Sequence, residues 1–150
     1  MSFLVIFFFN SCTKKDNTSQ DAETLETHLK LSHGDTISPF KYINTKTNDW
    51  KVVIRISGQD LIDMPENLTT RMFYTTDSKV LNRIKEWKFI YLDRKMSKAY
   101  STLRVYRDGE QLDNYGIIIE KNILALQSNK LGVLQSIDNN EILQIMKEMD

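Results

Sequence analysis

The chain has 150 residues, with 20 Lys plus Arg, 20 Asp plus Glu, and a formal net charge of zero. This length suits a single domain, in which roughly two-thirds of the unfolded chain's surface can be buried. A neutral total argues against a nucleic-acid partner, because proteins that bind phosphates usually carry a basic excess. With Cys12 as its only cysteine, the sequence excludes an intramolecular disulfide and a multi-cysteine zinc site.

The N-terminal residues 3–9 read FLVIFFF, and the polar stretch TKKDNTSQD follows Cys12 directly. This apolar run is too short for a membrane-spanning helix, which needs about 20 residues. It reaches the lower limit of the apolar region of a secretory signal, about 7–15 residues. We therefore interpret residues 1–11 as a signal peptide; a buried N-terminal strand is the alternative.

The segment Phe9-Asn10-Ser11-Cys12 resembles the lipobox of bacterial lipoproteins, which has a large apolar residue, a free position, a small residue and then Cys. With Phe in the first position, it is similar to the aromatic-rich lipoboxes of Bacteroidetes-type bacteria. The resemblance implies cleavage before Cys12 and diacylglycerol on the Cys12 sulfur. Two or more acyl chains hold a protein stably on a membrane, since each buried methylene contributes about 0.8 kcal/mol. We therefore expect a lipid-anchored protein of the cell envelope, at the outer membrane, on either its periplasmic or its surface face.

The stretch from Thr13 to Gly34 is polar and carries few apolar side chains. Such a stretch cannot bury enough surface to order itself. Residues 12–34 are therefore predicted to be the lipidated cysteine and a tether, and residues 35–150 a single folded domain.

Alternating apolar and polar residues predict strands within the domain. Residues 50–57, WKVVIRIS, show this period of two most clearly. The turn pair Asp108-Gly109 between two strand-like runs predicts a hairpin, and Gly116 suggests a bulge in its second arm. Similar patterns predict further strands at residues 68–75, 88–92, 100–107, 110–120, 123–127 and 133–136.

Two helices complete the prediction. Asp77 or Ser78 can cap a helix over residues 79–87, and Asp138 with Glu141 resembles a capping box before a C-terminal helix. The predicted fold class is therefore α+β: a mainly antiparallel sheet of five to seven strands with two helices packed on one face.

The sequence offers no recognisable catalytic set. His28 and His33 are the two histidines, and their spacing of five does not align them on one helical face. A Ser-His-Asp arrangement lacks support because both histidines fall in the tether and Cys12 is committed to lipid. Asp60, Asp63, Glu66 and Glu86 could supply a carboxylate pair for hydrolysis, but their spacing does not show that they converge, and surface loops explain them better. We expect no metal site, no cofactor and no nucleotide-binding motif.

The sequence also contains a candidate binding surface. Tyr100, Arg104 and Tyr106 alternate along one predicted strand, and Arg55 lies on the polar face of another. Tyr and Arg are enriched among the residues that dominate binding energies. An ordinary solvated sheet face is the alternative.

These observations favour a non-enzymatic protein-binding module in the envelope. One version is an immunity-type inhibitor that occupies a toxin delivered to the same compartment, an idea that rests on analogy. An envelope hydrolase with a carboxylate site and an accessory subunit of an outer-membrane complex are the alternatives. The expected partners are the membrane, through lipid on Cys12, and a protein; the oligomeric state is left open.

Overall fold

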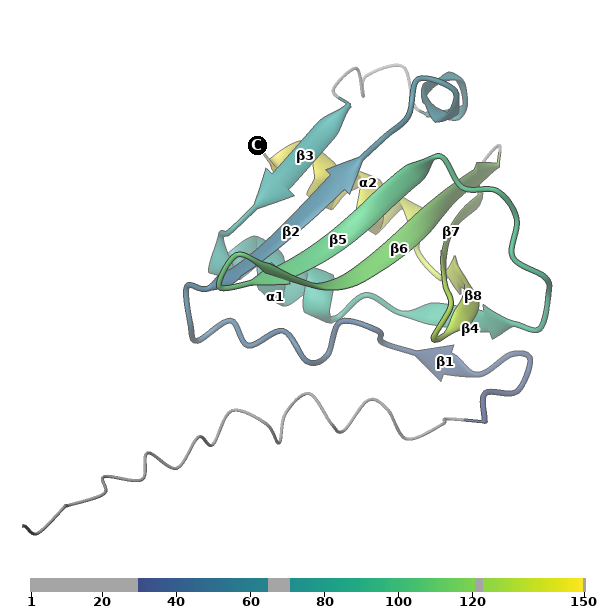
Figure 1. Cartoon of the computed structure of the whole chain (residues 1–150), viewed down its shortest axis with the longest axis horizontal. Coiled ribbons are helices and arrows are strands. Elements are labelled where there is room, and N and C mark those ends of the chain that lie inside the picture. Colours follow the sequence, from purple (N-terminus) through teal and green to yellow (C-terminus); the bar gives the residue numbers. More distant parts are fainter. Residues whose placement is uncertain (1–29, 65–70, 121–122, 150) are drawn as a thin grey trace, which may run out of the picture. The chain divides into compact units, whose positions relative to one another are not determined.

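A sheet and two α-helices make up the part of the chain that the computed structural model describes, which comprises residues 30–64, 71–120 and 123–149. Every pair of neighbouring strands is antiparallel. The spatial order is β1 (Thr36–Ile37), β4 (Phe89–Leu92), β8 (Gly132–Ser136), β7 (Ile123–Ser128), β6 (Glu110–Glu120), β5 (Ser101–Arg107), β2 (Trp50–Arg55) and β3 (Met72–Thr75) (Figure 1). The helices are α1 (Ser78–Lys85) and α2 (Asn139–Glu148), and a short 3₁₀ helix, η2, covers Asp60–Asp63. The predicted α+β class with a mainly antiparallel sheet is thus confirmed.

The sheet has eight strands in the described residues, so the prediction of five to seven was too low. The additional strand is β1, which has two residues and places Thr36 opposite Ile90 of β4. A main-chain bond of 2.8 Å from the Tyr91 N–H to the Asp35 carbonyl extends the contact. Two residues cannot display a period of two, so β1 is recognisable only from its position beside β4.

Strand β2 shows the alternation that the sequence predicts. Trp50, Val52 and Ile54 are buried, whereas Lys51 and Arg55 are exposed. Burial of one such apolar side chain stabilises the fold by about 1.5–3 kcal/mol. A slip of one residue would expose all three, and this cost fixes the register of β2 between β3 and β5.

The predicted hairpin joins β5 to β6 through Asp108 and Gly109. Their φ values are 50° and 81°, so both central residues of the turn adopt the positive φ that the tight hairpin requires. This part of the prediction is confirmed.

The second arm of the hairpin has an irregularity, as predicted, but at Leu112, which has no partner in β5, and not at Gly116. Gly116 lies in regular register with both neighbouring strands, and the ladder is irregular between Val105 and Tyr106 instead. Glycine is required at position 116 for another reason. A Cβ atom there would lie 2.7 Å from the Ala99 Cβ and 3.2 Å from Cγ of Gln127. The glycine therefore permits a segment from elsewhere in the chain to approach the sheet.

Both helices begin at the aspartates that the sequence indicates. The Asp77 side chain accepts a hydrogen bond from the Lys79 N–H at 2.7 Å, and Asp138 accepts one from the Glu141 N–H at 3.0 Å. Each bond satisfies one of the main-chain N–H groups that a helix leaves unpaired at its start. The helices contact each other, and Arg83 of α1 forms an ion pair with Glu148 of α2 at 2.5 Å.

One large hydrophobic cluster contains buried side chains from both helices and from strands β2 to β8. Its central members include Phe40, whose ring makes edge-on contacts with Trp87, Phe89 and Tyr115 at centroid distances of 5.4–6.3 Å. Strand residues that alternate with this cluster lie on the opposite face of the sheet. There a second, small cluster gathers Ile118, Ala125 and Val133, with Leu92 packed against it.

The connection between β4 and β5, residues 93–100, lies against strands β6 and β7. Its anchor is Gln127 of β7, whose amide oxygen accepts from the Ser97 N–H at 3.0 Å and whose amide nitrogen donates to the Ser97 carbonyl at 2.5 Å. Ala99 fills the space above Gly116. This connecting segment ends at Tyr100 and continues directly into strand β5, and so it borders the sheet face described next.

Candidate binding surface

Eight side chains of β2, β3 and β5 share the sheet face opposite the large core, and none of them is buried. We call this set the outer face: Lys51, Val53 and Arg55 of β2, Met72 and Tyr74 of β3, and Thr102, Arg104 and Tyr106 of β5. The three strands run side by side in Figure 1, with β2 in the middle. Their buried partners, such as Val52, Phe73 and Leu103, alternate with these residues along each strand.

The structure places three of the four predicted surface residues on this outer face. Arg55 lies opposite Thr102, two residues along β5 from Arg104, and Tyr106 lies opposite Lys51. Tyr100 immediately precedes β5 and is 46% exposed. The prediction for Arg104 and Tyr106 came from the alternation along β5. The pairing of β5 with β2 then brings Arg55 beside β5.

Sequence reasoning did not single out the contribution of β3. Met72 and Tyr74 are 55% and 43% exposed and extend the outer face on the far side of β2. The Lys51 ammonium lies 4.9 Å from the centre of the Tyr74 ring, a cation–π contact between neighbouring strands. The alternation MFYT was a usable signal, but only strand order shows that β3 adjoins β2.

The outer face carries cationic side chains and no carboxylate. Lys51, Arg55 and Arg104 point from it, and the register places the uncharged Asn114 of β6 opposite Arg104. No hydrogen bond or ion pair joins any of the three cations to another side chain of the described residues. The Nε of Arg104 is itself buried without an acceptor. The chain as a whole is neutral, so the compensating acids lie elsewhere.

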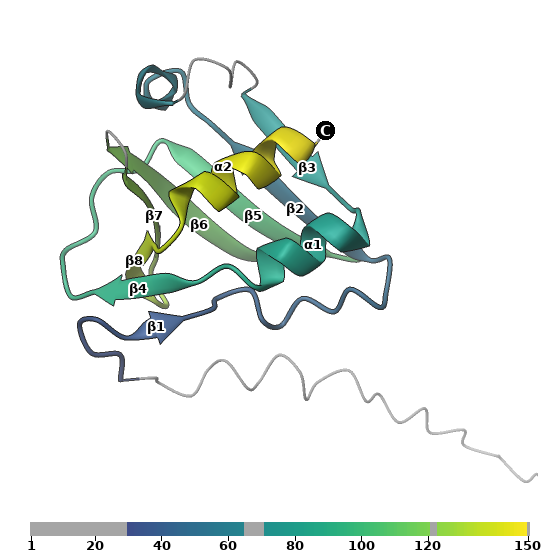
Figure 2. The ribbon, with the colours of Figure 1, turned by 180° about the vertical axis from the view of Figure 1, so that it is seen from behind.

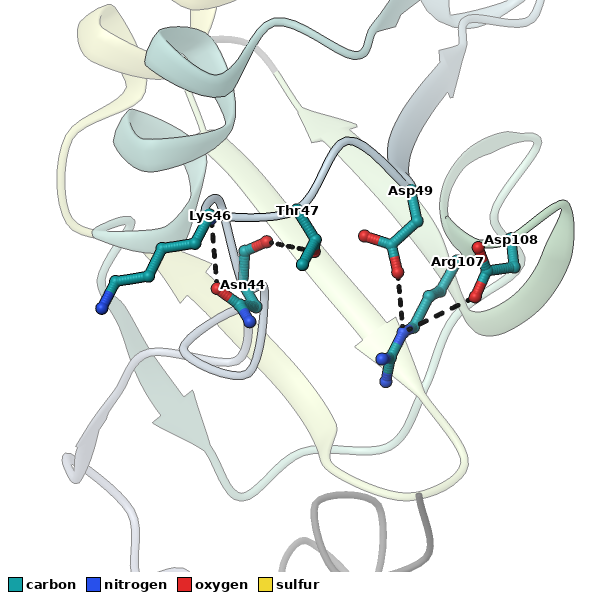
Figure 3. A network of polar contacts seen from close by, with 6 residues as sticks. All are labelled: Asn44, Lys46, Thr47, Asp49, Arg107 and Asp108. Atoms are coloured by element: carbon teal, nitrogen blue, oxygen red, sulfur yellow. Dashed lines mark hydrogen bonds and ion pairs between the residues drawn. The ribbon is translucent and has the colours of Figure 1, made fainter. Parts of the chain in front are cut away.

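A separate polar cluster lies at the hairpin end of the core face (Figure 3). Nε of Arg107 binds the Asp49 carboxylate at 3.0 Å and lies 4.0 Å from Asp108, while the guanidinium lies 5.5 Å from the ring centre of Trp50. The Asp108 N–H also donates to the Asp49 carbonyl at 2.9 Å. These contacts fasten the start of β2 to the β5–β6 turn.

The loop before β2 is ordered by its own polar contacts. The Asn44 side chain accepts from the Lys46 N–H at 3.1 Å, and the Thr47 hydroxyl donates to the Asn44 carbonyl at 3.0 Å (Figure 3). The adjacent Thr47 hydroxyl is the main cause that lowers the pKa of the Asp49 carboxyl, and the Arg107 guanidinium lowers it further. Because Asp49 is paired with Arg107 within the fold, we interpret this cluster as a contact that stabilises the loop.

Two tyrosines lie beside Asp113 near the same end of the sheet. The Tyr42 hydroxyl donates to the Asp113 carboxylate, and the Lys130 ammonium lies 3.9 Å from the same carboxylate. Burial, the neighbouring Tyr115 and the Asp113 charge raise the pKa of Tyr42 above its usual range. Burial and the Asp113 charge also raise the pKa of Tyr115. Both hydroxyls therefore stay protonated at neutral pH.

The candidate carboxylates of the described residues have different surroundings. Asp60 accepts hydrogen bonds from the hydroxyls of Ser57 and Ser101 and anchors η2 to the sheet. Asp63 borders a cavity of about 780 Å³, and Glu86 borders a different one of about 330 Å³. Glu66 lies outside the described residues.

Of the two histidines, the structure describes His33. His33 accepts a hydrogen bond from the Asp93 N–H at 3.3 Å, and His28 lies outside the described residues. Within residues 30–64, 71–120 and 123–149, no three His, Cys, Asp or Glu side chains are placed to hold a metal ion. None of the helices in that part of the chain has the length and hydropathy needed to cross a membrane.

Comparisons of the chain with protein-family models, with curated proteins and with solved structures give no match. Any statement about function therefore depends on the sequence and the geometry. Residues 1–11, Cys12 and the first part of the predicted tether lie outside the described residues, so the signal peptide and the lipid anchor stay predictions.

Proposed function

We propose that this chain is a lipid-anchored protein of the bacterial cell envelope whose domain binds another protein and catalyses no reaction. The lipobox-like segment ending at Cys12 supports the anchor. The observation that carries the binding role is the outer face. It combines exposed Met72 and Tyr74 with Arg55 and Arg104 on adjacent strands of one sheet.

We also infer that α1 and α2 both pack on the core face of the sheet and leave the outer face to a partner. The contact between the helices and their shared membership of the large hydrophobic cluster support this arrangement. So does the view in Figure 2, in which both helix ribbons lie in front of β2 and β5.

Exposed aromatic and Arg side chains on a rigid surface favour binding. Tyr and Arg are over-represented among residues that dominate protein interfaces, and the strands hold them in place before a partner arrives. In the described residues the small cluster of Ile118, Ala125 and Val133 and the 93–100 segment occupy the β6–β8 side of the same sheet surface. The β2–β3–β5 part is where the exposed side chains gather.

Metabolic labelling with a clickable palmitate tests the anchor. The native chain should be labelled and recovered with membranes, whereas Cys12→Ala should lose the label and the membrane association. Label that persists in Cys12→Ala contradicts the anchor.

Site-specific photo-crosslinking tests the binding role. A photoreactive amino acid replaces Tyr74 in the full lipidated chain, expressed in the cells that make it naturally. The matched control replaces Gln144, which is exposed on α2. We expect a protein adduct of discrete mass from position 74 and none from position 144. Equal adducts from both positions, or none from position 74, contradict the proposed function.

A further inference from the structure

We infer that the partner presents an acidic protein surface to the outer face, with Arg104 as the group that binds a partner carboxylate. This inference rests on the proposed function and adds the chemistry of the partner. The outer face holds Lys51, Arg55 and Arg104 on two neighbouring strands with no acidic side chain among its members. Charges of one sign on a surface favour a partner of the other sign and speed its encounter.

The state of Arg104 makes the inference specific. Its guanidinium has five N–H donors, and no described residue accepts a hydrogen bond from any of them. The Nε is covered by neighbouring atoms, whereas the two terminal nitrogens are not among the buried atoms and reach the solvent. No side chain of the described residues accepts from these terminal N–H groups, so they are available to an acceptor on a partner. A carboxylate fits best because its two oxygens match two N–H groups of the planar guanidinium.

The surroundings favour a protein over an anionic membrane surface. Polybasic segments that bind anionic lipids gather their Lys and Arg in one run of the chain, whereas Lys51, Arg55 and Arg104 are spread over two strands and the whole chain is neutral. Its cations are also interleaved with Tyr74 and Met72, which stand on the edge strand β3. Aromatic side chains beside Arg are typical of protein interfaces.

The crosslink at position 74 provides the assay. Arg104→Gln and Lys51→Gln each remove one charge from the outer face, and Lys147→Gln removes one exposed charge from α2 as the matched control. We expect Arg104→Gln to lower the adduct yield about tenfold or more, because a partner carboxylate loses its bidentate donor. Lys51→Gln should lower the yield less, and Lys147→Gln should leave it unchanged. Circular dichroism confirms that each variant is folded.

Two further arms define the ligand. Arg104→Lys retains the charge but loses the planar fork, so its yield should fall between those of wild type and Arg104→Gln. Soluble poly-L-glutamate should compete with the adduct, whereas poly-L-lysine should not.

Three outcomes would overturn the inference. One is an adduct that persists at the wild-type level in Arg104→Gln, which leaves protein binding itself standing. Another is a crosslinked peptide of the partner without acidic residues. The third is binding of the full chain carrying Cys12→Ser to vesicles of phosphatidylcholine and phosphatidylglycerol that is lost in Arg104→Gln, which would assign the face to lipid. Absence of any adduct at position 74 refutes the proposed function instead.

Discussion

Replacing Gly116 by Ala tests whether the 93–100 segment is packed against the sheet as tightly as the structure indicates. The new Cβ would lie 2.7 Å from the Ala99 Cβ, 3.2 Å from Gln127 Cγ and 3.3 Å from Gln127 Nε2. Carbon atoms in contact rest at about 3.5–4.0 Å, so Ala99 has to move by roughly 1 Å. Overpacking of this kind costs about 1–3 kcal/mol.

A second effect opposes this cost. Gly116 does not adopt a positive φ, so alanine fits its backbone and restricts the unfolded chain. This gain is about 0.4–1 kcal/mol. We therefore expect Gly116→Ala to lower the free energy of unfolding by about 0.5–2 kcal/mol, which corresponds to roughly 2–8 °C in melting temperature. Urea unfolding followed by Trp fluorescence measures the free energy, and circular dichroism measures the melt.

A matched control and a second-site change isolate the cause. Gly58→Ala places its Cβ no closer than 3.8 Å to any atom, at the mobile end of the Arg71 side chain, and should be neutral or stabilising. Ala99→Gly opens the space above position 116, so it should recover most of the loss in the double variant. The reasoning is refuted if Gly116→Ala is as stable as wild type, or if its cost is the same with Ala99→Gly.

Three further changes probe the polar contacts of the fold. Gln127→Ala removes both hydrogen bonds to the Ser97 main chain and should cost about 1–3 kcal/mol by thermal melting; no change would mean that the segment does not depend on them. Asp138→Ala deletes the bond to the Glu141 N–H and should cost about 1 kcal/mol in urea unfolding, with Asp138→Asn close to wild type. The pKa of Asp49 is below its usual 3.8 in the fold. The ionised Asp49 carboxylate therefore contributes fully to the free energy of unfolding above pH 3.8. This contribution is lost as the pH falls through the pKa of Asp49 in the folded protein. When the free energy of unfolding is measured against pH, Asp49→Asn should lose less stability in acid than wild type does. Identical curves for the two proteins would contradict the role assigned to Asp49.

Local patterns predicted the elements well where they carried a repeating signal. The alternation of Trp50, Val52 and Ile54 predicted β2 because one face of the strand meets the core and the other does not. Asp108-Gly109 predicted the hairpin because few residues adopt positive φ at low cost. Each of these signals depends on residues that are close together in the chain, so it can be read from a short stretch of sequence.

Predictions failed where distant segments decide. Gly116 looked like a bulge because a glycine in a strand has several causes, and here the cause is Ala99, brought close by the tertiary fold. Strand β1 was missed because its two residues gain strand geometry only by pairing with β4. The local sequence does not identify either contact.

The sequence by itself determined the class of the fold, the caps of both helices, and the alternation that sets Arg104 and Tyr106 apart from the buried Val105. It also contains the lipobox-like segment ending at Cys12 on which the proposed membrane address depends. Only the tertiary structure decided that β3, β2 and β5 are neighbours. Strand order depends on contacts between segments far apart in the chain, and it alone turns scattered Arg and Tyr residues into one surface with uncompensated charge.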